Sequence, residues 1–206
     1  SLWWDTLPDD LRIPLGQPLP GDTDADVAIV GAGYTGLWTA YYLQRLDPSL
    51  RIVLLDAEQA GFGASGRNGG WASHLFPSSL DAMARQSSRD AALRMRQAMN
   101  ATVDEIGRVA DLEGWDIHWS KGGTVVAART PLQWQSAQDE VRTSRSWGLG
   151  DSDLRLLDRD ETLRMVRATD VLGGTYTPHC AAIHPARLVR SRSEEHTSEL
   201  QSRLHL

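Results

Sequence analysis

The first half of the chain contains two apolar runs of β-strand length with a helix-forming segment between them. Asp26–Val30 and Arg51–Asp56 are the apolar runs, and the residues from Tyr34 to Gln44 favour a helix. Short apolar runs bounded by glycine or polar clusters are typical of buried parallel strands. The order therefore predicts a strand–helix–strand unit at the start of an α/β domain.

Further along the chain, helical and strand-like patterns alternate less regularly. From Ser87, which we expect to be an N-cap, apolar residues recur at helical spacing and predict a helix whose stripe faces the core. The residues of this stripe are Met95, Met99, Val103, Ile106 and Ala110. Strands are expected at 115–119 and 123–128, joined as a hairpin at 120–122, and again at 171–176.

Capping signals locate two more helices. Thr130 and Gln133 have the spacing of a capping box, so a helix should begin there and end at Gly148. A shorter helix is expected over 159–166, behind Asp158.

The N-terminal residues differ in composition from the rest. Residues 1–25 are rich in proline and aspartate and predict an extended lead-in, with Trp3 and Trp4 packed onto the domain surface. Together with the mixed strands and helices that follow the first unit, this order implies an α/β domain interrupted by a second domain.

Composition narrows the class of protein without naming its chemistry. With 206 residues, 41% of them apolar, the chain can form one large domain or two small ones. The net charge of −6 argues against nucleic acid or an anionic membrane as a partner. Cys180 is the single cysteine, which fits a reducing compartment. No run is long and apolar enough to span a bilayer, so we expect a cytoplasmic protein.

A glycine-rich turn with G-x-G-x-x-G spacing separates the first strand from the first helix. Gly31 would permit a sharp turn, Gly33 would let the backbone approach a pyrophosphate, and Gly36 would let the helix pack against the strand. Asp56, 20 positions after Gly36, could accept hydrogen bonds from ribose hydroxyls. This context predicts a dinucleotide site. The alternative is that the glycines only form a tight turn and that Asp56 only ends a strand.

A second glycine-rich turn follows the second strand and indicates which dinucleotide is bound. A nicotinamide-binding fold would usually continue into a helix, whereas residues 61–70 supply five glycines, which suggests backbone lying against a flat ring. Ser65, Arg67 and Asn68 could add hydrogen bonds to phosphate, ribitol or ring. The alternative is a flexible loop, which Phe62 next to these glycines argues against.

These runs together resemble a known family. The segments 26–43, 54–58 and 61–71, with 121–124 and 176–189 later, resemble FAD-dependent oxidoreductases of the D-amino-acid oxidase family, and most closely its gamma-glutamylputrescine oxidase-like branch. The resemblance covers residues 1 to about 190 and implies a Rossmann-like FAD-binding domain with an inserted α+β substrate domain, both truncated here.

The resemblance also implies domain limits. The FAD-binding domain would cover 1–115, the first part of the substrate domain 116–180, and a return helix 181–191. Residues 192–202 resemble the translation of a common sequencing adapter, so we expect 192–206 to be a non-native tail, the alternative being a genuine polar terminus.

The chemistry that the resemblance implies is oxidation of the carbon–nitrogen bond of an amine or amino acid. A hydride would pass to flavin N5, leaving an imine, with oxygen or a quinone as electron acceptor. The sequence identifies no catalytic residue, and the spacing of His179, Cys180 and His184 matches no zinc pattern, so no metal is expected. His74 is a candidate flavin neighbour, although a surface or loop position is the favoured interpretation. The alternatives are an NAD-dependent dehydrogenase or an inactive truncated nucleotide-binding fragment.

The residues that we expect to bind FAD are Gly31, Ala32, Gly33, Tyr34, Thr35, Gly36, Asp56, Ala57, Gly63, Ala64, Ser65, Arg67, Asn68, Gly69 and Gly70.

Overall fold

The computed structural model describes residues 1–12, 19, 21–194 and 202–203, and these form two compact units. Unit 1 comprises 1–70, 113–118 and the part from 183 onward, and unit 2 comprises 71–112 and 119–182. The predicted boundary at residue 115 does not coincide with the first change of unit, which falls at 70–71. The reason is that the strand beginning at Trp71 pairs with residues 180–182, inside unit 2.

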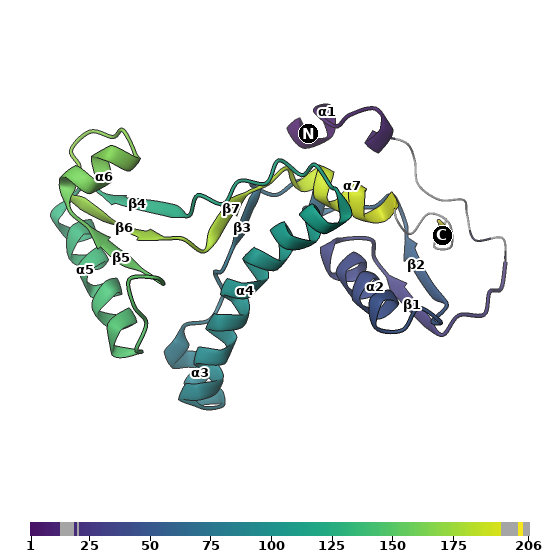
Figure 1. Cartoon of the computed structure of the whole chain (residues 1–206), viewed down its shortest axis with the longest axis horizontal. Helices are drawn as coiled ribbons and strands as arrows, with labels where there is room; N and C mark the ends of the chain where they lie inside the picture. The colour runs from purple at the N-terminus through teal and green to yellow at the C-terminus, as the bar shows by residue number, and fades with distance from the viewer. Residues whose placement is uncertain (13–18, 20, 195–201, 204–206) are drawn as a thin grey trace. The chain divides into compact units, whose positions relative to one another are not determined.

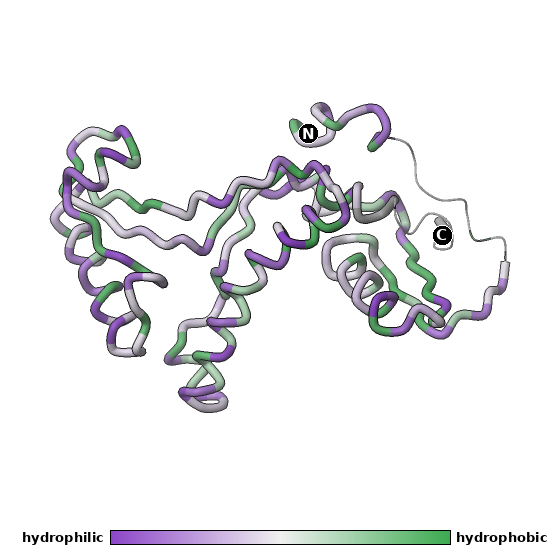
Figure 2. Tube along the Cα trace, in the orientation of Figure 1, coloured by the Kyte–Doolittle hydropathy of each residue, from purple (hydrophilic) through white to green (hydrophobic). Residues whose placement is uncertain are grey.

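Unit 1 begins with the predicted strand–helix–strand arrangement (Figure 1). Strands β1 (Val27–Val30) and β2 (Ile52–Asp56) are parallel, with Val27 opposite Ile52, and helix α2 (Tyr34–Leu46) connects them. Their mostly hydrophobic residues are visible in Figure 2. A two-residue strand, β8 (Ser202–Arg203), pairs with β2, whereas 195–201 and 204–206 of the predicted tail lie outside the described residues.

The core of unit 1 lies between α2, the end of β2 and helix α7 (Pro185–Glu194). Helix α7 occupies the position of the predicted return helix, and its Val189 is buried with Leu37 and Leu54. Because residues of α2, β2 and α7 share one buried cluster, helix α7 holds the first βαβ unit in place.

The N-terminal lead-in is not extended throughout, because it forms helix α1 (Leu2–Asp5) and the 3₁₀ helix η1 (Asp10–Arg12). The predicted packing of its tryptophans is confirmed, since Trp3 and Trp4 pack against a buried cluster in unit 1. That cluster consists of Leu7, Leu11 and Ala186.

Unit 2 contains a two-stranded ribbon and a three-stranded antiparallel sheet. The ribbon pairs β3 (Trp71–Ser73) with β7 (Cys180–Ala182). The sheet has the order β4–β6–β5. Its strands are β4 (Thr124–Ala128), β5 (Arg155–Leu157) and β6 (Gly173–Thr177).

Two helices predicted from their capping signals cover opposite faces of this sheet. Helix α5 (Pro131–Ser146) begins with the Thr130–Gln133 capping box, and α6 (Arg159–Met165) begins behind Asp158 with a second one. A Cβ added at Gly173 would meet Trp134 of α5, whereas one added at Gly174 would approach Thr162 of α6. Since successive strand residues face opposite sides, the two helices lie on opposite faces.

Helix α4 (Arg89–Glu113) is the predicted long helix, preceded by α3 (Leu80–Gln86), which was not predicted. The N-terminal cap of α4 is formed by Ser88, whose Oγ accepts the Ala91 N–H at 3.1 Å, rather than by Ser87, which ends α3. Val103 and Ala110 of the predicted stripe are buried, but Met95 is 40% exposed. No helix in the described ranges joins enough length to enough apolar character to cross a membrane.

The predicted strand at 115–119 and its hairpin with 123–128 are wrong. Residues 115–119 form no strand, and β4 pairs instead with β6, so that Thr124 lies opposite Thr177. The segment is held by long-range backbone bonds, since His184 N–H donates to Ile117 O at 2.8 Å. A partner distant in sequence thus overrides the local hairpin signal.

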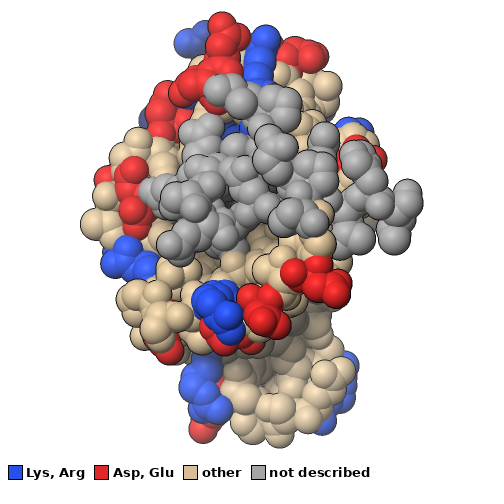
Figure 3. Space-filling view, turned by 90° about the vertical axis from the view of Figure 1, so that its right-hand side faces the viewer, with Lys and Arg blue, Asp and Glu red and all other residues tan. Residues whose placement is uncertain are grey.

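On the face drawn in Figure 3, acidic and basic side chains are interspersed among uncharged residues.

Candidate cofactor site

The first glycine turn has the geometry that its spacing predicts. Gly31 follows β1 with φ of 104°, a conformation that favours glycine, and its N–H donates to Leu55 O at 2.6 Å. A Cβ at Gly36 would lie 2.0 Å from Gly31 O and 3.2 Å from Ile29 Cγ2. Only glycine fits at position 36, where the helix packs against the turn and against Ile29 of β1, so the predicted packing role of Gly36 is confirmed.

The N-terminus of α2 presents backbone N–H groups to the turn. Gly33 is the N-cap, and the first bond of the helix runs from Leu37 N–H to Gly33 O at 3.0 Å. The Tyr34 N–H donates to Ser65 Oγ at 3.0 Å, which joins the helix end to the second glycine turn. The N–H groups of Thr35 and Gly36 have no intrahelical partner, as expected at a helix start, and they are suited to an anion.

Asp56 organises the turn from the end of β2. Its Oδ2 accepts the Ala32 N–H at 2.7 Å, and its Oδ1 accepts the Glu58 N–H at 2.9 Å. A carboxylate has lone pairs for about four hydrogen bonds, so these two contacts leave capacity for a ligand hydroxyl. Asp56 can therefore both end strand β2 and accept a hydrogen bond from a ribose hydroxyl.

The second glycine turn is joined directly to the first and folded against it. The Gly61 N–H donates to Ala32 O at 3.0 Å, and residues Ala64–Gly66 form the 3₁₀ helix η2. A Cβ at Gly61 would lie 2.3 Å from Val189 Cγ1. The loop is thus packed on α7, which contradicts the alternative of a flexible linker.

Asn68 holds this loop together through both ends of its side chain. Its Nδ2 donates to Ser65 O at 3.0 Å, and its Oδ1 accepts the Gly70 N–H at 2.9 Å. The Trp3 indole N–H also donates to the Asn68 carbonyl at 2.7 Å. The sequence predicted a ligand contact for Asn68, whereas these bonds give it a role in shaping the loop. Sequence reasoning missed the contribution of Trp3, and the two tryptophans in a polar lead-in are the signal that could have found it.

Tyr34 is fixed at the junction of the two turns. Its O–H donates to Pro185 O at 3.1 Å, and the Asn68 amide lies 3.5 Å from the same oxygen. Burial raises the pKa of Tyr34 to about 12, and the hydrogen bond from Asn68 acts in the opposite direction. The phenol therefore stays protonated at neutral pH and acts as a donor.

Several glycines leave the backbone open on one side. A Cβ added at Gly31, Gly63 or Gly69 would meet no atom within 4 Å. By contrast, Gly66 and Gly70 are buried, and a Cβ at either would collide with backbone. The turns therefore combine packed glycines with open ones, and the open ones fit close approach of a phosphate-bearing, flat ligand.

The two remaining candidate FAD-binding residues, Arg67 and Ala57, are exposed at the surface of unit 1. Arg67 is exposed, with its guanidinium carbon 4.6 Å from the centre of the Phe62 ring, and Ala57 is exposed after Asp56. Their exposure leaves both available to a ligand.

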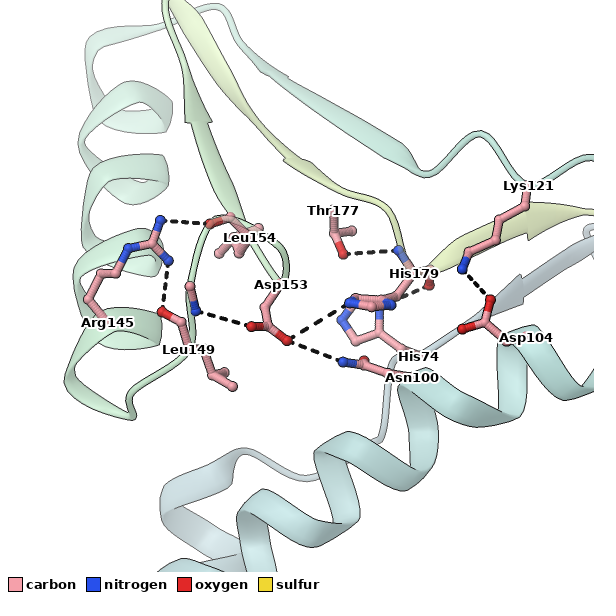
Figure 4. A network of polar contacts seen from close by, with 11 residues as sticks. His74, Asn100, Asp104, Lys121, Arg145, Leu149, Asp153, Leu154, Thr177 and His179 are labelled. Carbon is pink, nitrogen blue, oxygen red and sulfur yellow. Dashed lines mark hydrogen bonds and ion pairs between the residues drawn. The ribbon is translucent and has the colours of Figure 1, made fainter.

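Unit 2 contains a separate polar cluster around His74 (Figure 4). His74 lies in the loop after β3, as the favoured interpretation allowed, but it is buried and does not lie at the surface. Its Nδ1 donates to His179 O at 3.0 Å, and burial, together with the Arg96 and His179 charges, lowers the pKa of His74. Asp153 accepts from Asn100 Nδ2 at 3.3 Å and lies 3.9 Å from His179 Nε2. Within the described ranges, no three His, Cys, Asp or Glu side chains are grouped to hold a metal.

Comparison with known proteins bears on the site. The family model described as FAD dependent oxidoreductase matches residues 26–195. The chain is 32% identical to gamma-glutamylputrescine oxidoreductase of Escherichia coli over 79% of its length and 37% of the relative. It is also 32% identical to a probable oxidoreductase, OrdL, of Rhizobium meliloti, over 91% of this chain and 42% of that protein. The chain thus spans less than half the length of these relatives.

A similar fold occurs among solved structures. The crystal structure of glycine oxidase from Geobacillus kaustophilus aligns over 85% of this chain and 45% of that chain, with a TM-score of 0.62 and 22% identity. At this identity the likeness supports the fold alone.

Proposed function

Because the chain belongs to the FAD-dependent oxidoreductase family, we propose that it forms part of a flavoprotein that oxidises the carbon–nitrogen bond of an amine or amino acid. The observation that carries the proposal is the pair of joined glycine turns, whose open backbone at Gly31, Gly63 and Gly69 fits a dinucleotide. FAD is the cofactor of this family, which argues against the alternative of a nicotinamide-dependent dehydrogenase.

Unit 1 would hold the cofactor. The N–H groups at the start of α2 would bind the pyrophosphate, and Asp56 would accept hydrogen bonds from a ribose. Ser65 and Asn68 would position the second turn through their bonds to Tyr34 N–H and Gly70 N–H. When bound, FAD would accept a hydride from the carbon next to the substrate nitrogen, and the substrate would become an imine.

Unit 2, which comprises 71–112 and 119–182, would contain the first part of the substrate domain, for which the sequence predicts 116–180. The identity of 32% to a gamma-glutamylputrescine oxidoreductase supports a small amine as substrate and a place in that branch. Oxygen or a quinone would accept the electrons, and the cytoplasm would be the compartment. We assign no role to 192–206, in line with their resemblance to a translated sequencing adapter.

A valine at an open glycine tests the assignment. Gly63→Val places a branched side chain where the structure has no atom within 4 Å, so it should leave the fold intact and exclude the cofactor. We expect the purified protein to show flavin absorption and the variant to lose it. Gly33→Val should also lose flavin, but its Cβ would already lie 3.0 Å from Ser65 Oγ, so Gly63 separates binding from stability better.

The matched control is Gly122→Val in unit 2, where an added Cβ also meets no atom within 4 Å. This variant should retain flavin. Full flavin content in the Gly63→Val protein, at an unchanged melting temperature, would show that the second turn does not contact the cofactor.

A further inference from the structure

The N-terminal segment of unit 1 packs on the second glycine turn at a buried glycine. A Cβ added at Gly70 would lie 3.0 Å from Trp3 Cζ2 and 3.1 Å from Trp3 Cη2, so the indole ring lies directly on the backbone there. Gly63 and Gly69 of the same turn are exposed, and an added Cβ at either meets no atom within 4 Å. Trp3 therefore contacts the turn without occupying the backbone that is open to a ligand.

A hydrogen bond joins Trp3 to this turn across 65 positions of the chain. The Trp3 indole N–H donates to Asn68 O at 2.7 Å. The side chain of Asn68 closes the turn on itself, because it donates to Ser65 O and accepts the Gly70 N–H. Trp3 thus acts on the residue that sets the conformation of the turn.

Trp3 is itself oriented by contacts with His184, which precedes helix α7. The two rings meet edge to face, with their centroids 5.0 Å apart. Because His184 Nδ1 accepts the Arg187 backbone N–H at 3.1 Å, the proton of the neutral ring lies on Nε2, which donates to Thr6 Oγ1 at 3.0 Å. Thr6 Oγ1 donates in turn to Leu2 O at 2.7 Å, so the helical turn that carries Trp3 is tied to His184.

A second attachment fixes the end of the N-terminal segment. Arg190 of α7 is fully buried, and its Nε donates to Leu11 O at 2.8 Å. Leu7 and Leu11 are buried together with Ala186 of α7. Residues 1–12 are therefore held at two points, beside His184 and on α7, and they present Trp3 to the second glycine turn from a fixed support.

We propose that Trp3 is a positioning residue of the cofactor site, whose indole holds residues 61–70 in the conformation that receives the flavin part of FAD. This inference rests on the proposed function, since it assigns FAD to the two glycine turns. Loss of the bond to Asn68 lowers the fraction of the protein whose second turn is ready to bind, and the apparent affinity falls by the same factor. One hydrogen bond changes such an equilibrium about two- to tenfold.

Trp3→Phe tests the hydrogen bond, because it removes the indole N–H and keeps an aromatic ring next to Gly70. The probes are FAD and ADP, each titrated into the flavin-free whole protein. ADP carries the pyrophosphate and the ribose that the first turn and Asp56 are expected to bind, but it has no flavin. We expect Trp3→Phe to bind FAD about two- to tenfold more weakly than the wild type and to bind ADP equally well, which also shows that the variant is folded.

Trp4→Phe is the matched control. Trp4 is half-buried like Trp3 and also lies beside the turn, since its Nε1 would be 3.1 Å from a Cβ added at Gly66. In the part of the chain that the structure describes, its indole N–H donates to no protein atom. The same loss of an indole N–H next to the same turn should therefore leave the affinities for FAD and ADP as they are in the wild type.

Hydrogen exchange reports on the turn without any ligand. The Gly70 N–H donates to Asn68 Oδ1 at 2.9 Å, and opening of the turn exposes it to exchange. We expect this N–H to exchange about two- to tenfold faster in Trp3→Phe than in the wild type or in Trp4→Phe.

Two results would overturn the proposal. Unchanged FAD affinity in Trp3→Phe would mean that the bond to Asn68 does not position the turn, and an equal loss of FAD and ADP affinity would mean that Trp3 stabilises unit 1 as a whole. A wild-type protein that binds neither probe would instead refute the cofactor assignment. The exchange rate of Gly70 separates these cases, because it shows whether Trp3 fixes the turn when no flavin is present.

Discussion

The close packing of α2 on the first turn leaves no room for a side chain at Gly36. In Gly36→Ala, the new Cβ would lie 2.0 Å from Gly31 O, 3.3 Å from Gly31 C and 3.2 Å from Ile29 Cγ2. The colliding atom is backbone, so it cannot move aside by rotation of a side chain. Helix and turn must separate by about 1 Å, which is the kind of shift that costs about 1–3 kcal/mol in a packed core.

The net effect follows from two opposing contributions. A backbone collision belongs at the upper end of that range, about 3 kcal/mol, and the better helix propensity of alanine returns about 1 kcal/mol. We therefore expect the free energy of unfolding to fall by about 2 kcal/mol. For a chain of this size that corresponds to a melting temperature lower by roughly 4–8 °C.

Gly63→Ala is the matched control, because its Cβ meets no atom within 4 Å and its φ of −77° suits alanine. It should leave stability unchanged or raise it by up to about 1 kcal/mol through the unfolded state. Thermal and urea unfolding followed by circular dichroism measure both variants. If Gly36→Ala unfolds at the same temperature as Gly63→Ala, the close contact between strand and helix does not exist as described.

Two further predictions concern contacts around α7. The pKa of His184 is lowered mainly by burial and to a smaller extent by the charge of Arg187. The Nδ1 of His184 accepts the backbone N–H of Arg187 at 3.1 Å. The unfolded chain therefore takes up a proton at this residue at a higher pH than the folded chain does, so stability should fall as pH drops from 7 to 5. His184→Gln should reduce that slope in urea unfolding at several pH values, and an unaltered slope would exclude His184 as its source. Tyr34→Phe removes the 3.1 Å bond to Pro185 O and should cost about 1 kcal/mol of unfolding free energy, whereas an unchanged urea midpoint would mean that this bond contributes nothing.

The elements that sequence predicted well are those with local signals. The capping boxes at Thr130 and Asp158 each fix a helix start through residues three positions apart, and the apolar runs around the first glycine turn fix β1 and β2. The three-residue strands β3, β5 and β7 were missed. Each of these strands forms because it pairs with a segment distant in the sequence, as Trp71 pairs with Ala182. A segment of three residues is too short to show a hydrophobic periodicity of its own.

For the candidate site, the sequence by itself determined where side chains are absent. The spacing of Gly31, Gly33 and Gly36 predicts a tight turn whose backbone a ligand can approach closely. Only the tertiary structure decided how the polar residues are used. Ser65 and Asn68 bond to backbone groups that the sequence could not place beside them, because hydrogen-bond partners depend on how two separate turns meet. The same reason hid that Arg96 of α4 and Glu140 of α5 line one cavity, since their helices are brought together by packing and not by any pattern that either helix carries.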